Sequence, residues 1–429
     1  MIGLARRWFQ PMPKSLKIFL LAVSSVLVFV VLLGPRFSGV SAATEPQQQQ
    51  DGAYRQINVY SEVLRHVQTD YVVDPNIPDV TSGALRGLLE SLDADSSYLS
   101  ADDYKAYKAD KGGKAQVGIN ISKRYGYAIV VSTVPGSPAD RAGLNNSDII
   151  EAIDGHDTRD ISLAMIRMML EGDSGSELML AVIRPRRPAP DKIILNRTVA
   201  QIPAVTETMY ENSSILYLKP LVLDREHVQQ VESKLKAMNK AGNKKILLDL
   251  RDTAAGDMNE AIRLANLFLK SGTIAMLEGQ KVPRQTFTAE PSKAINATAP
   301  MTVLVNRGTA GPGELVAAAL QDNHRANLVG EKTFGEGSQQ KTFELEDGAA
   351  LILSVAKYES PSGKKLQDEG VTPEVIVASS SSSDDDGVDE DMDDSISPDS
   401  QPAAPAPKPA VTVDDQLNKA LGLLKSKTS

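Results

Sequence analysis

The spacing of apolar residues changes along the chain, and these changes outline its parts. Between residues 52 and 110 apolar positions recur every three or four residues, which predicts amphipathic helices. Between residues 191 and 378 short unbroken apolar runs, such as 245–250 and 301–305, alternate with glycine-rich turns and helical stretches. Alternating buried strands and helices are typical of a layered α/β fold with a parallel sheet.

The region between residues 306 and 340 contains two glycine-rich turns of special interest. The strand at 301–305 precedes a turn of Gly, Thr and Pro and a helix expected at 314–322. A second apolar run, 326–330, leads to the glycine turn at 335–337. Turns at the carboxyl ends of parallel strands are where such sheets place their chemistry. We therefore expect a functional site at these two turns.

Residues 111–190 have the pattern of a separate, mostly β domain. A Gly-Ser-Pro-Ala turn at 136–139 precedes a short helix, Asp154-Gly155 forms a hairpin turn, and 178–184 is a closing strand. The arrangement resembles a PDZ domain, which binds a chain end by strand addition and holds its carboxylate with backbone N–H groups.

The PDZ resemblance implies a peptide-binding site in this domain. Its residues would be those of the carboxylate loop and two apolar residues of the following helix: Val117, Gly118, Ile119, Leu163 and Ile166. The alternative for each apolar residue is burial in the core of the domain.

The two turns contain Gly308-Thr309-Ala310 with Glu314, and the run from Val329 to Gly337. With these residues they resemble the C-terminal processing serine peptidases, also called tail-specific proteases. This resemblance implies a crotonase-like α/β core and serine-type proteolysis by a Ser nucleophile, a Lys general base and a supporting Gln. On this chain the nucleophile position is Gly311, the base position is Glu336, and the Gln is retained as Gln340.

These substitutions remove the parts that Ser/Lys hydrolysis needs. Acyl transfer requires a nucleophile, a base and donors for the oxyanion. Gly311 has no attacking atom, and Pro312 lacks the N–H that the resemblance assigns to one oxyanion donor. The turn that would carry the second donor is rewritten as 253–255, with Gly256 remaining.

Displaced nucleophiles are the alternative to a lost activity. Thr309 and Ser338 lie in the right turns, although Ser and Thr in turns usually bond to the backbone. Arg251 is expected to form an ion pair with a nearby carboxylate. The chain has no Cys, and its four His residues are scattered, so the sequence predicts neither a metal site nor a cofactor.

The N-terminal segment predicts export. Basic residues precede an uncharged apolar run at 18–33 and a small-residue site at 40–42, so residues 1–42 read as a signal peptide or a signal anchor. Residues 43–51 read as a linker. The body is expected in the periplasm or another extracytoplasmic space, either released or anchored to the inner membrane.

The remaining segments complete the expected organisation. Residues 52–110 form a helical cap that, by the resemblance, also makes a homo-oligomer. Residues 379–410 are acidic and then Pro/Ala-rich, which predicts a disordered tail before a short helix at 411–429. Residues 379–400 hold nine acidic residues and no Lys or Arg, so they account for the net charge of −9, and the absence of a basic patch argues against nucleic-acid binding.

Two functional hypotheses follow. In the first, the chain is a pseudoenzyme that binds the C-terminal segments of exported proteins without cutting them. In the second, it is an active serine-type endopeptidase that cleaves C-terminal regions of exported proteins with a displaced nucleophile.

Overall fold

The computed structural model describes residues 45–110, 115–184, 189–199, 201–241, 245–379 and 413–426. The expected signal segment and nearly all of the acidic and Pro/Ala-rich tail lie outside these residues. None of the helices that the structure describes has both the length and the apolar character needed to cross a bilayer.

The first compact unit, residues 1–77, contains helix α2 (Glu45–Asp70). Most of the linker expected at 43–51 is therefore helical, because Gln is a good helix former. Helix α2 exposes apolar side chains at Ile57, Tyr60 and Val63.

The second unit, residues 78–429, is built around a six-stranded sheet with the order β19-β16-β15-β11-β9-β8. Its strands are β8 (Thr206–Tyr210), β9 (Ile215–Lys219), β11 (Lys245–Asp249), β15 (Met301–Val305), β16 (Asn327–Gly330) and β19 (Val375–Ile376). All neighbours pair in parallel except β8 and β9. The parallel sheet confirms the predicted α/β class.

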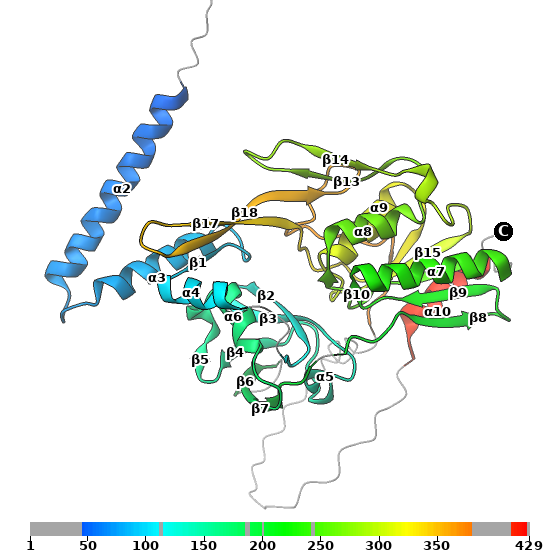
Figure 1. Cartoon of the computed structure of the whole chain (residues 1–429), viewed down its shortest axis with the longest axis horizontal. Coiled ribbons are helices and arrows are strands. Elements are labelled where there is room, and N and C mark those ends of the chain that lie inside the picture. Colours follow the sequence, from blue (N-terminus) through cyan, green and yellow to red (C-terminus); the bar gives the residue numbers. More distant parts are fainter. Residues whose placement is uncertain are drawn as a thin grey trace, which may run out of the picture. The chain divides into compact units, whose positions relative to one another are not determined.

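Apolar side chains alternate between the two faces of this sheet, as strand geometry requires. Leu248 and Val303 face a large core beneath α7 (Arg225–Ala241), α8 (Met258–Asn266) and α9 (Pro312–Asp322). Leu247 and Leu304 face the C-terminal helix α10 (Asp415–Ser426) on the other side (Figure 1).

Arg251 fastens the C-terminal helix to the sheet. Its guanidinium lies 2.6 Å from Asp249 and 2.9 Å from Asp414, just before α10. Tyr217 donates a hydrogen bond to the same Asp249 carboxylate at 2.9 Å. The ion pair expected for Arg251 is confirmed, and its role is structural.

A second sheet joins the N-terminal helices to the core. It consists of β1 (Ser97–Leu99), β13 (Thr273–Glu278), β14 (Gln285–Thr288), β17 (Ser338–Glu344) and β18 (Ala350–Glu359). Strand β1 interrupts the region expected to be purely helical, between α3 (Ile77–Glu90) and α4 (Ala101–Ala109). It forms because it pairs with β18, a distant partner that local spacing cannot reveal.

The domain expected to be a PDZ domain has its own sheet, β2-β3-β4-β6-β7 with β5 beside β4, and the helices α5 and α6. Their bounds are β2 (Ile119–Arg124), β3 (Tyr127–Thr133), β4 (Ile149–Ile153), β5 (His156–Asp157), β6 (Glu177–Ile183), β7 (Asp191–Asn196), α5 (Pro138–Arg141) and α6 (Leu163–Leu170). Strand β7 pairs along β6, so the domain continues past the expected boundary at 190. The sequence pattern alone predicts 178–184 as the closing strand of the domain.

Buried Glu314 connects the two glycine turns. Its Oε2 accepts hydrogen bonds from the N–H groups of Gly311 at 3.0 Å and Glu336 at 2.7 Å. Its Oε1 accepts from the N–H of Gly335 at 2.7 Å and from the Thr333 hydroxyl. Four donors from two separate loops therefore converge on one carboxylate.

The carboxylate of Glu314 has no exposed surface. Burial raises the pKa of Glu314 to about 7, against the four hydrogen bonds, which lower it. Because every bond is donated to the carboxylate, a neutral side chain with its own N–H groups would fit this site poorly.

We expect Glu314→Gln to destabilise the fold. The Gln amide would place an NH2 group where one carboxylate oxygen now accepts hydrogen bonds. The N–H donors facing it would lose their acceptor, which should lower the free energy of unfolding by about 2–4 kcal/mol. Urea unfolding of the whole chain measures this loss. The exposed Glu346→Gln is the matched control and should change stability by less than about 0.5 kcal/mol. Equal effects of the two changes would contradict the role given to Glu314.

Candidate functional site

The candidate site lies where three loops leave adjacent parallel strands. The loops follow the carboxyl ends of β11, β15 and β16, which are neighbours in the sheet. They carry residues 253–256, 306–311 and 331–336, respectively. The parallel register thus gathers at one sheet edge the three segments that the sequence singled out.

Gly311 occupies a sharp turn between strand β15 and helix α9. Its backbone angles are φ +50° and ψ −111°, which glycine adopts more easily than other residues. A Cβ built there would lie 3.9 Å from the Ala254 carbonyl oxygen and from Met258 Cε, which is ordinary contact. The turn resembles the strained strand-to-helix turn that exposes a nucleophile in hydrolases.

Pro312 is the first residue of helix α9, a position that suits proline because its missing N–H would lack an intrahelical partner. The same feature removes one candidate oxyanion donor. The turn therefore has the shape for a nucleophile, but it has neither the attacking atom nor this N–H group.

Glu336 lies close to Gly311, since both N–H groups bond to the same oxygen of Glu314. The structure thus brings together the two positions that the resemblance assigns to the nucleophile and the base. The Glu336 carboxylate lies 3.6 Å from the Arg167 guanidinium of the PDZ helix α6. Burial and the nearby Asp95 carboxylate hold the pKa of Glu336 above its ordinary value, while Arg167 acts in the opposite direction.

Thr309 is engaged inside the fold. It is fully buried, and its hydroxyl donates to the Leu250 carbonyl at 2.8 Å while accepting from the N–H of Asn306 at 3.0 Å. This bonding ties two of the loops together and leaves Thr309 inaccessible to a polypeptide.

Ser338 and Gln340 both bond to Asp95, which precedes β1. The Ser338 hydroxyl donates to the Asp95 carboxylate, and the Gln340 side-chain amide donates to the Asp95 carbonyl, each at 2.9 Å. Burial raises the pKa of Asp95. The retained Gln340 therefore positions the segment before β1, and Ser338 has a carboxylate rather than an amine as its neighbour.

Gly256 is explained by a close backbone approach. It lies in β12 (Ala255–Gly256), which pairs with β10 (Val222–Leu223). A Cβ at Gly256 would lie 2.4 Å from the Leu223 carbonyl oxygen, and the φ of +135° also favours glycine. Its presence is thus required by packing and does not by itself indicate an oxyanion site.

The PDZ domain carries a cavity of about 240 Å³ between strand β2 and helix α6. Ile119 and Ile121 line it from the strand, and Arg167, Leu170 and Glu171 line it from the end of the helix. A smaller cavity of about 120 Å³ lies beside Gly118 and Ile119. The expected carboxylate loop therefore borders open space.

The other expected peptide-binding residues lie elsewhere. Val117 and Ile166 are fully buried in the core of the domain, and Leu163 lines a neighbouring cavity. Arg167 and Leu170 of helix α6 line the 240 Å³ cavity instead; we call this cavity between β2 and α6 the PDZ groove. Helical spacing from Leu163 could have indicated them, because they lie one and two turns further along α6.

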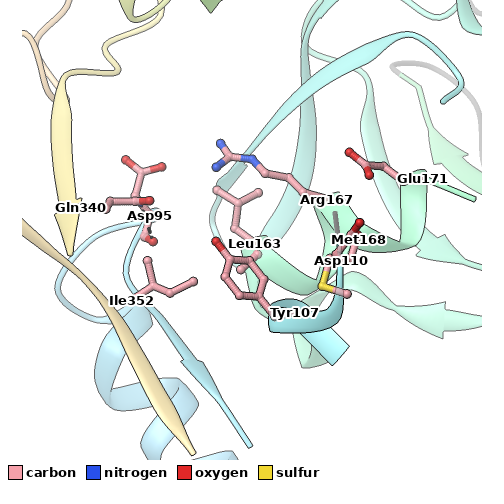
Figure 2. A pocket seen from close by; sticks show the side chains of 10 residues that line it. Asp95, Tyr107, Asp110, Leu163, Arg167, Met168, Glu171, Gln340 and Ile352 are labelled. Atoms are coloured by element: carbon pink, nitrogen blue, oxygen red, sulfur yellow. Dashed lines mark hydrogen bonds between the residues drawn. The ribbon is translucent and has the colours of Figure 1, made fainter. Parts of the chain in front are cut away.

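The neighbouring cavity, about 340 Å³, lies between α4, α6 and the β17–β18 hairpin. Figure 2 shows Arg167 extending from α6 toward Asp95 and Gln340 across this space. Within the residues that the structure describes, no group of His, Cys, Asp and Glu could hold a metal ion.

Comparisons with known proteins agree with this architecture. Residues 214–377 match peptidase family S41, and residues 129–184 match the PDZ domain. The carboxyl-terminal-processing protease of Synechocystis sp. is 30% identical over 379 residues, covering 85% of this chain and 88% of the relative. That of Picosynechococcus sp. is 31% identical over 368 residues, covering 82% and 88%.

Among solved structures, a photosystem II D1 C-terminal processing protease has the same fold. It aligns with a TM-score of 0.63 at 24% identity, over 75% of this chain and 92% of that protein. With relatives of this identity and coverage, the chain belongs to the carboxyl-terminal-processing proteases of peptidase family S41 and carries a PDZ domain.

Proposed function

We propose that this chain binds the C-terminal segments of exported proteins through its PDZ groove and lacks Ser/Lys hydrolysis. The observation that carries the proposal is the turn at Gly311. It keeps a backbone shape suited to a nucleophile and has room for a Cβ, but it offers no side chain. The base position, Glu336, is a carboxylate paired with Arg167.

The position of the groove supports a binding role. Its cavity is lined by the PDZ residues Ile119, Ile121 and Leu170 and also by Ala254 and Glu336 of the core. A chain end added to β2 would therefore lie against the loops in which a protease of this family would need its catalytic groups. Backbone pairing and carboxylate capture supply affinity without chemistry.

An active peptidase with a displaced nucleophile is the second candidate. Its support is Ser338, whose hydroxyl contacts Asp95, a residue that lines two cavities. A carboxylate can accept the proton of a hydroxyl, but the N–H group of residue 312 is missing as an oxyanion donor. Thr309 is the weaker candidate because it is fully buried.

The proposal also includes export of the chain and formation of a homo-oligomer. A signal peptide or anchor at 1–42 would place the body in the periplasm or another extracytoplasmic space. The exposed apolar residues of α2 support a homo-oligomer through the N-terminal helices.

The first test separates binding from cleavage. The purified chain is titrated with a fluorescent peptide that ends in an apolar residue, and intact mass is followed over hours. We expect saturable binding, weaker binding of the same peptide with an amidated C-terminus, and no product. A product that disappears in Ser338→Ala or Thr309→Ala would instead support the displaced nucleophile.

The second test restores the missing groups. We expect Gly311→Ser, Pro312→Ala and Glu336→Lys, combined, to create measurable cleavage of the same peptide, because no neighbour blocks the new Cβ and only the φ of +50° strains the Ser backbone. The matched control carries Ala at position 311 with the other two changes and should remain inactive. If the Ser variant folds and binds the peptide but releases no product, the loops do not retain a catalytic arrangement.

A further inference from the structure

A second cavity adjoins the PDZ groove beside the end of strand β2. Its volume is about 250 Å³. Arg124 and Tyr125 line it from the turn between β2 and β3, and Phe334 and Glu336 line it from the loop after β16. Glu336 lines the PDZ groove as well, so the two spaces are neighbours. We call this second space the end cavity.

Arg124 lies against the ring of Phe334 at the wall of the end cavity. The central carbon of its guanidinium is 4.2 Å from the centre of the ring, and a guanidinium N–H group donates a hydrogen bond to the Phe334 carbonyl oxygen. A guanidinium is planar and stacks on aromatic faces. Because Arg124 is exposed, the face turned away from Phe334 is accessible to a second ring.

Tyr125 presents its ring to solvent beside the same cavity. It is the first of the two turn residues between Arg124 and Tyr127, which pair across β2 and β3. Tyr125 and the following Gly126 have φ angles of +54° and +84°, which suit Asn, Asp or Gly better than Tyr. The Tyr125 side chain is 98% exposed. Neither the geometry of the turn nor core packing therefore accounts for a tyrosine here.

The direction of strand addition leads a bound polypeptide toward the end cavity. Strand β2 is the last strand of its sheet, so one of its edges is open to a ligand. A peptide whose carboxylate lies at the loop before β2 runs antiparallel to that strand. Its last residue lies beside Ile119, and earlier residues follow β2 to its end at Arg124. The residue about five or six positions before the last one then reaches the end cavity.

The charges around the end cavity favour an uncharged ligand side chain. Asp95, Glu336 and Asp368 line it, so an acidic side chain would meet three carboxylates. A basic side chain would meet the guanidinium of Arg124. An aromatic ring stacks on the guanidinium and against Tyr125 without placing a new charge among these groups.

We propose that the end cavity binds an aromatic side chain about five or six residues before the C-terminus of the bound polypeptide, by stacking it on Arg124 and against Tyr125. The inference rests on the proposed binding of C-terminal segments and adds a recognition site outside the PDZ groove. The whole chain would thereby distinguish polypeptides whose last residues are identical.

The test compares two long peptides with the same C-terminal residues. They differ only in carrying Phe or Ser at the positions that reach the end cavity, and a short peptide contains only the shared last residues. We expect the whole chain to bind the Phe peptide about threefold to tenfold more tightly than the Ser peptide. In Tyr125→Ser this ratio should fall, and in Arg124→Lys it should fall toward one, because an ammonium group keeps the charge but has no planar face.

Binding of the short peptide should be unchanged in both variants, since it does not reach the end cavity. The exposed Tyr54→Ser on helix α2 is the matched control and should leave the ratio unchanged. Equal binding of the Phe and Ser peptides, or a preference that survives both changes, would overturn the aromatic site while binding of the short peptide still supports the proposed function. If none of the peptides binds, the proposed function fails, and this inference fails with it.

Discussion

The bonding of Glu314 is the constraint on which the site depends. One buried carboxylate holds the start of helix α9 and the turn after β16 by four hydrogen bonds. It thereby fixes Gly311 and Glu336 against each other, whatever their side chains are. The arrangement of the loops does not depend on the residues that a serine peptidase would use for chemistry, so those residues could change while the scaffold kept its shape.

The side chain at position 336 affects the charge of the candidate site more than its shape. An ammonium group at position 336 and a guanidinium at Arg167 would repel each other, whereas Glu336 attracts Arg167. The attraction links the PDZ helix to the core, as does the contact of Asn146 with Asp252, while Lys123 pairs with Glu90 of helix α3. Glu336 thus contributes to the docking of the PDZ domain on the core.

The sequence predicted those parts of the fold that local patterns specify. Apolar runs followed by glycine-rich turns predicted the parallel sheet and the edge at which the candidate site lies. Turn residues outlined the PDZ domain. The pairing of β1 with β18 and of β7 with β6 depends on distant or separated partners, so local spacing missed both. Arg167 and Leu170 were not among the expected cavity-lining residues, although their helical spacing from Leu163 could have indicated them.

The proposed function depends on the turn at Gly311, which has a shape suited to a nucleophile and offers no side chain. A fluorophosphonate reacts with an activated Ser or Thr hydroxyl and leaves a fixed mass increase. We would incubate the whole chain with such a probe and measure its intact mass. The account predicts an unchanged mass at saturating probe. A single adduct mapped to Ser338 or Thr309 would contradict it and would identify a working displaced nucleophile.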